Sequence, residues 1–132
     1  PAPKLLTSKP RAFRILVRNE LFRRVALAAR EAWRELGELD GGSGFGAERW
    51  EQAMDEYYDV HDSLGIGPHA RSAALLILEE GTSASGPGVW RARQIFDDPA
   101  GDHDWGITAE IDLAASNEAG AAVVRVLAVD QL

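Results

Sequence analysis

The spacing of apolar residues changes along this chain from the period of a helix to the period of a strand. Between Asn19 and Leu36, apolar residues recur every three or four positions, which is typical of an amphipathic helix. Between Trp105 and Leu113, apolar and polar residues alternate, which is the period of a half-buried strand. Helices followed by an antiparallel meander predict an α+β fold of two layers, with long N-terminal helices packed on one face of a curved antiparallel sheet.

The helical part is expected to span residues 9–64, after a linker-like lead-in at residues 1–8. Ser8 is the predicted N-cap of the first helix, and Pro10 lies in its first turn. The apolar stripe rotates near Asn19, which indicates either a break there or one long helix buried on several faces, and we favour a long helix that can kink at this point. Four arginines are expected on the solvent-facing side of this helix: Arg23, Arg24, Arg30 and Arg34.

A second helix is expected from Ala47 to about Ser63, between glycine-rich segments at residues 40–46 and 65–70. Residues 42–47 and 65–70 fit the dinucleotide-binding pattern G-x-G-x-x-G/A. Each follows a helix rather than the buried strand that the pattern requires, so we predict no cofactor site in this chain. The buried stripe of the second helix would consist of Trp50, Met54, Tyr57, His61 and Leu64.

Residues 73–132 are expected to be mainly β, with strands at 89–96, 105–113 and 121–130 and a turn at 116–120. Residues 73–80 form a short apolar run that fits either a strand or one short helix. In the strand at 105–113, Thr108, Glu110 and Asp112 should face away from the helices. The side chains expected to face the helices are Trp105, Ile107, Ala109, Ile111 and Leu113.

The composition is that of a packed globular domain. The chain has 132 residues, 45% of them hydrophobic, which supports one domain. It has no cysteine, which excludes disulfides and zinc–thiolate sites. No apolar run is long enough to span a membrane, so we expect a cytoplasmic protein. The chain begins at Pro1 rather than Met, and we therefore expect a domain excised from a larger protein.

Positive charge is concentrated at the start of the chain. Residues 1–34 hold nine basic and two acidic side chains, although the whole chain has a net charge of −7. Arg11, Arg14 and Arg18 share a helical face, which makes them a candidate nucleic-acid or docking surface. The alternative is that these arginines form salt bridges within the domain. The expected acidic partners in that case are Asp55, Asp59 or Asp62.

The three histidines, His61, His69 and His103, do not share metal-ligand spacing on one element. His103 lies in a turn rich in aspartates, where oxygen ligands for Mg²⁺ or Ca²⁺ are conceivable. The pattern lacks the alternating acidic positions and the closing Glu of an EF-hand loop, and a solvated hairpin turn is the better interpretation. We therefore predict no metal site. The aspartates of this turn are Asp97, Asp98, Asp102 and Asp104.

Two long segments carry a family resemblance. Residues 11–25 (RAFRILVRNELFRRV) and 90–105 (WRARQIFDDPAGDHDW) resemble the DUF3516 family, found as the C-terminal region of actinobacterial DEAD/DEAH-box helicases. The resemblance covers about Lys9 to Leu132. It implies a parent protein whose ATP- and Mg²⁺-dependent helicase motor lies upstream. This chain has no phosphate-binding loop and no D-E-A-D/H box, so no ATPase residue is carried over.

The resemblance thus implies a non-catalytic accessory domain whose partners are the upstream motor domains and, through the basic N-terminal helix, RNA or DNA. The order of elements also resembles the NTF2-like (cystatin-like) α+β cone, although that family usually has more strands than the three or four expected here. The alternative function is accordingly a small-molecule-binding domain or a pocket enzyme on that scaffold. Its cavity would be lined by Tyr57, His61, Trp90 and Trp105.

Overall fold

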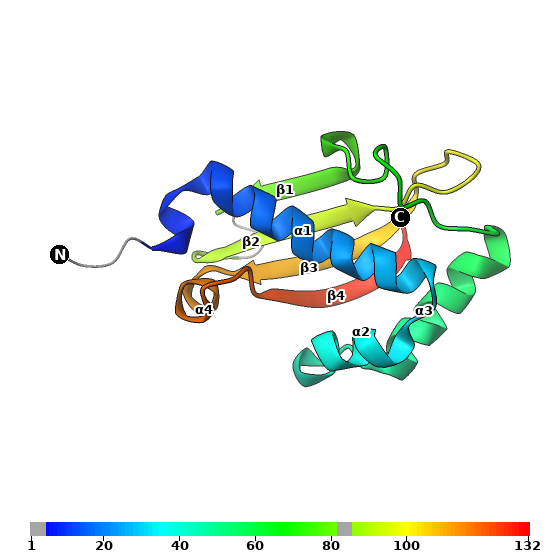
Figure 1. Ribbon diagram of the computed structural model, residues 1–132, viewed down its shortest axis with the longest axis horizontal. Helices are drawn as coiled ribbons and strands as arrows, with labels where there is room; N and C mark the ends of the chain where they lie inside the picture. Colours follow the sequence, from blue (N-terminus) through cyan, green and yellow to red (C-terminus); the bar gives the residue numbers. More distant parts are fainter. Residues whose placement is uncertain (1–4, 82–85) are drawn as a thin grey trace.

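An antiparallel sheet of four strands forms one layer of the structure, and a long helix lies along one of its faces (Figure 1). The computed structural model describes residues 5–81 and 86–132. The strands lie in the order of the sequence, each beside the next, so the sheet is a simple meander. This arrangement confirms the predicted two-layer α+β fold. The strands are β1 (Leu76–Glu80), β2 (Val89–Ile95), β3 (Trp105–Asp112) and β4 (Val124–Gln131).

The alternating segment forms β3 with the predicted orientation. Ile107 and Ile111 are fully buried, whereas Asp112 is exposed, and Thr108 and Glu110 are partly accessible. The alternation ends at Leu113, which does not continue the strand as predicted but begins a short helix, α4 (Leu113–Ala119). The segment 73–80, which fitted either a strand or a short helix, contains both a turn and a strand: Ala73–Leu75 form a single 3₁₀ turn, η3, and the strand β1 follows.

Three helices make up the other layer: α1 (Pro10–Ala29), α2 (Trp33–Asp40) and α3 (Ala47–Val60), preceded by a 3₁₀ turn, η1 (Leu6–Ser8). Helix α1 crosses the sheet, and α2 and α3 form a pair at the end where α3 contacts β4 (Figure 1). The predicted extended lead-in at 1–8 is thus partly a 3₁₀ turn, and residues 1–4 lie outside the described part. Helix α3 ends at Val60, three residues before the predicted Ser63.

Helix α1 is continuous through Asn19, which agrees with one long helix and excludes a break at that residue, and the chain breaks at residues 30–32 instead. The amide of Glu31 donates to the carbonyl of Ala28 (3.1 Å) and that of Ala32 to Leu27 (2.9 Å). These two bonds form a Schellman motif, which ends the helix. Glu31 has φ of +56°, a conformation that glycine usually supplies, and the sequence therefore carries no glycine signal for this break.

The predicted N-cap is wrong. Helix α1 begins at Pro10, and Lys9 occupies the N-cap position without a side-chain hydrogen bond. The hydroxyl of Ser8 donates instead to the carbonyl of Leu5, at 2.6 Å. Pro10 at the first helical position is sufficient to begin the helix, because its φ is already helical and it has no amide to satisfy.

Arg24 is buried, contrary to the prediction that it faces solvent. Its guanidinium forms an ion pair with the carboxylate of Asp40 at 2.7 Å, and the indole nitrogen of Trp50 donates to the same carboxylate at 3.0 Å. Arg24 is 3% exposed and Asp40 0%. The three residues come from α1, α2 and α3, so one carboxylate joins all three helices at their point of contact.

The loop between β3 and β4 contains α4, which the sequence analysis missed in favour of a turn. The carboxylate of Asp112 accepts from the amide of Ala115 at 2.9 Å and caps the helix, and Gly120 ends it in a left-handed conformation. The hydroxyl of Ser116 donates to the Asp112 carbonyl and accepts from the Val123 amide. As a result β4 begins at Val124 rather than at Ala121.

The two faces of the sheet differ in character. The face under α1 is apolar, and the ring of Phe13 packs edge-on against Trp90 with centroids 5.0 Å apart. On the other face, the guanidinium of Arg93 lies against Gly106 and pairs with Asp130 of β4 at 2.8 Å. This face is thus more polar than the face under α1, although Arg93 itself is only 9% exposed.

Candidate functional site

Three of the four residues predicted to line a pocket lie together. The ring centroid of Tyr57 is 5.1 Å from that of His61 and 5.8 Å from that of Trp105. Trp90 lies apart from them, in the contact with Phe13 described above. Tyr57, His61 and Trp105 are 0%, 6% and 5% exposed, so their rings fill the core at the contact between α3 and the sheet.

Tyr57 is held within the fold by its own hydroxyl, which donates to the carbonyl of Ser63 at 2.6 Å. Burial raises the pKa of Tyr57 well above its ordinary value, and the nearby carboxylate of Asp98 raises it further. His61 also borders an open depression of about 390 Å³ on the surface beside Tyr58. In these contacts the predicted pocket residues act as packing and hydrogen-bonding groups.

The three arginines of the predicted basic face have different surroundings. Arg14 forms two hydrogen bonds with the carboxylate of Glu80, of which Nη2 to Oε1 is 2.9 Å. Arg11 is exposed, whereas Arg18 is partly buried, and its Nε is buried without a hydrogen-bond partner among the described residues. Within residues 5–81 and 86–132, no ion pair joins the three arginines to the predicted partners Asp55, Asp59 or Asp62.

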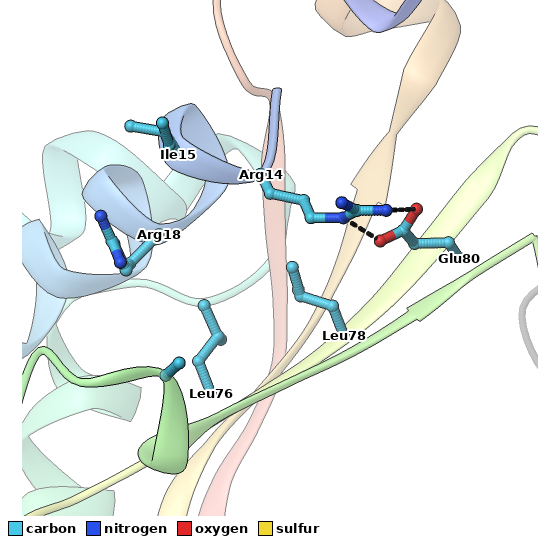
Figure 2. A pocket seen from close by; sticks show the side chains of 7 residues that line it. Arg14, Ile15, Arg18, Leu76, Leu78 and Glu80 are labelled. Carbon is cyan, nitrogen blue, oxygen red and sulfur yellow. Dashed lines mark hydrogen bonds and ion pairs between the residues drawn. The ribbon is translucent and has the colours of Figure 1, made fainter. Parts of the chain in front are cut away.

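Arg14 and Arg18 flank a groove between α1 and the edge strand β1, with a volume of about 340 Å³ (Figure 2). Its floor is apolar, and Ile15 on its rim is 48% exposed. Figure 2 shows the Arg14–Glu80 pair on one side and the side chain of Arg18 on the other. We call this feature the α1–β1 groove; it is lined by Arg14, Ile15, Arg18, Ala73, Leu76, Leu78 and Glu80.

The groove follows from the local sequence of both elements. On β1, Leu76, Leu78 and Glu80 alternate with outward-facing residues and therefore share the face toward α1. On α1, Arg14 and Arg18 lie one turn apart on the same side. Because β1 is an edge strand that pairs only with β2, nothing in the described part of the chain closes the groove on that side. Sequence analysis identified the arginines but missed the apolar wall, because the run at 73–80 could not be assigned to a strand.

A second group of titratable side chains lies at the end of the sheet formed by the β2–β3 connection, where all three histidines of the chain meet the aspartates of that connection. We call it the histidine corner. The sequence predicted no metal site here, because the side chains come from three separate segments. The corner consists of two groups whose potential ligand atoms lie within 4.8 Å of one another: His69, Asp97 and His103, and His61, Asp98 and Asp104.

Within residues 5–81 and 86–132, no helix combines the length and apolar character that crossing a membrane requires.

Comparison with known proteins gives one match. The model of a family described as "Domain of unknown function (DUF3516)" matches residues 1–129, which confirms the resemblance found in the sequence. No curated protein and no solved structure matches the chain. The likeness to the NTF2-like cone and the helicase context therefore stay predictions.

Proposed function

The chain belongs to the DUF3516 family, and from this we propose that it is a non-catalytic accessory domain of an ATP-dependent DEAD/DEAH-box helicase, where it binds a protein segment of the helicase motor in the α1–β1 groove. The observation that carries this proposal is the groove itself. It places accessible apolar surface at Ile15, Leu76 and Leu78 beside two arginines, and a protein segment with an apolar side chain and a carboxylate can contact both.

The chemistry of the groove favours a protein segment over nucleic acid. A phosphate backbone is bound by clustered cations, but Glu80 already neutralises Arg14. The acidic remainder of the chain, which gives it a net charge of −7, also repels a polyanion. A protein segment that presents an apolar side chain and a carboxylate fits better, because the guanidinium of the partly buried Arg18 forms no ion pair among the described residues and can donate hydrogen bonds to that carboxylate.

A non-catalytic role is supported by what the buried polar groups do. The hydroxyl of Tyr57 is engaged by Ser63, and the carboxylate of Asp98 accepts hydrogen bonds from two backbone amides. Asp40 is engaged by Arg24 and Trp50. The alternative, a pocket enzyme on an NTF2-like scaffold, would need these groups free in a cavity, and their mutual contacts favour the accessory role.

The first test is genetic. The reading frame upstream of this chain should encode a helicase motor with a phosphate-binding loop and a D-E-A-D/H box. An open reading frame without such a motor would overturn the helicase part of the proposal.

The second test separates a protein partner from a nucleic acid. The separately expressed motor, and in parallel single-stranded RNA and DNA, are titrated by calorimetry against wild type and Ile15→Lys. Lysine removes the exposed apolar contact, so motor affinity should fall at least about tenfold. Val60→Lys is the matched control, because Val60 is 64% exposed at the end of α3, away from the groove.

The two classes of partner give opposite results. A groove that binds protein loses motor affinity in Ile15→Lys and keeps it in Val60→Lys. A basic face that binds nucleic acid instead gains affinity for RNA or DNA in Ile15→Lys, because a cation is added beside Arg11 and Arg18. That gain, with motor affinity unchanged, would contradict the proposal.

A further inference from the structure

The histidine corner gathers side chains that are far apart in the sequence. His61 follows the end of α3, His69 lies in the loop that leads to β1, and His103 lies in the connection between β2 and β3. In the fold, His69 and His103 lie beside each other with ring centroids 5.7 Å apart and a tilt of 39°. The carboxylate of Asp97 completes this outer group, so two imidazoles and one carboxylate converge from two loops.

The spacing of the outer group suits a bound metal ion. The Nε2 of His103 is 3.5 Å from Oδ1 of Asp97. A tetrahedral ion with bonds of about 2.0–2.1 Å places neighbouring ligand atoms roughly 3.4 Å apart. The observed separation is longer than an N–H···O hydrogen bond, which is at most about 3.2 Å, so the two side chains are placed together without being bonded to each other.

The backbone around the outer group is fixed by other contacts. The carboxylate of Asp98 accepts from the amides of Asp102 at 2.9 Å and His103 at 2.7 Å, and this holds His103 in its left-handed conformation, with φ of +55°. The amide of Gly65 donates to the carbonyl of Asp97 at 2.9 Å, which ties the loop that carries His69 to the β2–β3 connection.

Gly65 permits this close approach. A Cβ at that position would lie 2.8 Å from Oδ2 of Asp97, so a larger residue would displace the Asp97 carboxylate. Asp98 and Gly65 thus act as positioning residues for His103 and Asp97, as outer-shell partners do in metal sites.

We propose that His69, Asp97 and His103 bind a divalent transition-metal ion of the zinc class, through two imidazole nitrogens and one carboxylate oxygen. Imidazole ligands favour such an ion over Mg²⁺ or Ca²⁺, which prefer oxygen. Three protein ligands leave one position of a tetrahedral ion for water or for a group from a partner. His69 is exposed and the other two ligands are partly accessible, so the ion can enter from solvent.

The inner group is engaged by the chain itself in large part, although Oδ1 of Asp104 is buried without a hydrogen-bond partner among the described residues. Both carboxylate oxygens of Asp98 already accept backbone hydrogen bonds, and the Nε2 of His61 is 3.8 Å from Oδ2 of Asp98. One carboxylate oxygen of Asp104 accepts from Gln131 at 2.6 Å. The inner group therefore supports the β2–β3 connection beneath the outer one, and one ion per chain is expected.

The test is zinc binding by the untagged chain after dialysis against a chelator. Calorimetric titration with ZnCl₂ should give one ion per chain, and Co²⁺ should give the visible absorption of a low-symmetry four-coordinate site. Zinc at about a hundred times its Kd should raise the Tm by roughly 5–15 °C, because it binds only the folded chain. Titration with CaCl₂ should show at least about tenfold weaker binding than zinc.

Two variants decide which residues are ligands. His69→Ala should weaken zinc binding at least about tenfold and remove the cobalt absorption. Because His69 is exposed, this variant should keep the fold, which circular dichroism checks. Asp102→Asn is the matched control: it lies in the same connection and is exposed, but it is outside both groups, so binding should not change. Equal zinc affinity in wild type and His69→Ala, or binding of calcium in preference to zinc, would overturn the proposal.

Discussion

Replacing Asp40 by alanine should destabilise the domain more than any other single change to a charged residue on its helices. The substitution removes the partner of the Arg24 guanidinium, which is 3% exposed, and the acceptor of the Trp50 indole. Removing one member of a buried ion pair costs about 3–5 kcal/mol, because the other charge stays buried without compensation. The unpaired Trp50 donor adds about 1–3 kcal/mol. The total is a large part of the roughly 5–15 kcal/mol typical of a domain.

The free energy of unfolding is measured by urea titration and the Tm by thermal melting, with circular dichroism and the fluorescence of the four tryptophans as probes. Asp40→Ala should lower the Tm by roughly 10–25 °C. The control is Glu35→Ala, which breaks the Arg30–Glu35 pair, whose side chains are 63% and 52% exposed. Exposed pairs contribute at most about 1 kcal/mol.

A double variant tests the physical reason for this difference. If the cost comes from an uncompensated buried charge, Arg24→Met combined with Asp40→Leu should be much more stable than Asp40→Ala alone. The reasoning is refuted if Asp40→Ala costs no more than Glu35→Ala, or if the double variant is as unstable as the single one.

Three further outcomes are expected. The pKa of Tyr57 is raised in the folded chain, whereas the unfolded chain ionises this residue near pH 10. The free energy of unfolding should therefore fall as the pH rises above about 10. Urea unfolding across that range should show a shallower fall in Tyr57→Phe. Gly106→Ala should cost about 2 kcal/mol or more in the same assay, because its Cβ would lie 2.5 Å from the backbone oxygen of Gln94. The isolated chain should hydrolyse no ATP in a coupled steady-state assay with Mg²⁺; a rate that persists through repurification at constant specific activity would contradict the proposed non-catalytic role.

The elements that the sequence predicted well are those in which local pattern and burial agree. The alternation at 105–113 became a strand because one face of β3 packs under α1 while Thr108 and Glu110 remain partly accessible. The helix break at 30–32 was not predicted, because Glu31 occupies the position where glycine is the usual signal. The charge of Arg24, taken alone, predicts a solvent-exposed side chain. Only the fold shows that Asp40 lies opposite it.

The two candidate sites depend on tertiary contacts in different degrees. The arginines of the groove lie on one helix, so their shared face follows from a spacing of four residues, and the sequence could predict it. Glu80, the partner of Arg14, is 66 residues away from it in the sequence and could not be predicted from spacing. The histidine corner has no local pattern at all, because its ligands are brought together by the loop after α3 and the β2–β3 connection.

The loop at residues 61–72 joins the two proposed sites. It carries His69 at one end of the sheet, and it leads directly into Ala73, which lines the α1–β1 groove. Between them, the guanidinium of Arg71 lies 5.0 Å from the ring centroid of Phe22 on α1, so the loop contacts the helix that forms the other wall. If an ion at His69 and His103 changes the affinity of the groove for its partner through this loop, linkage requires that the partner change the affinity for the ion by the same factor.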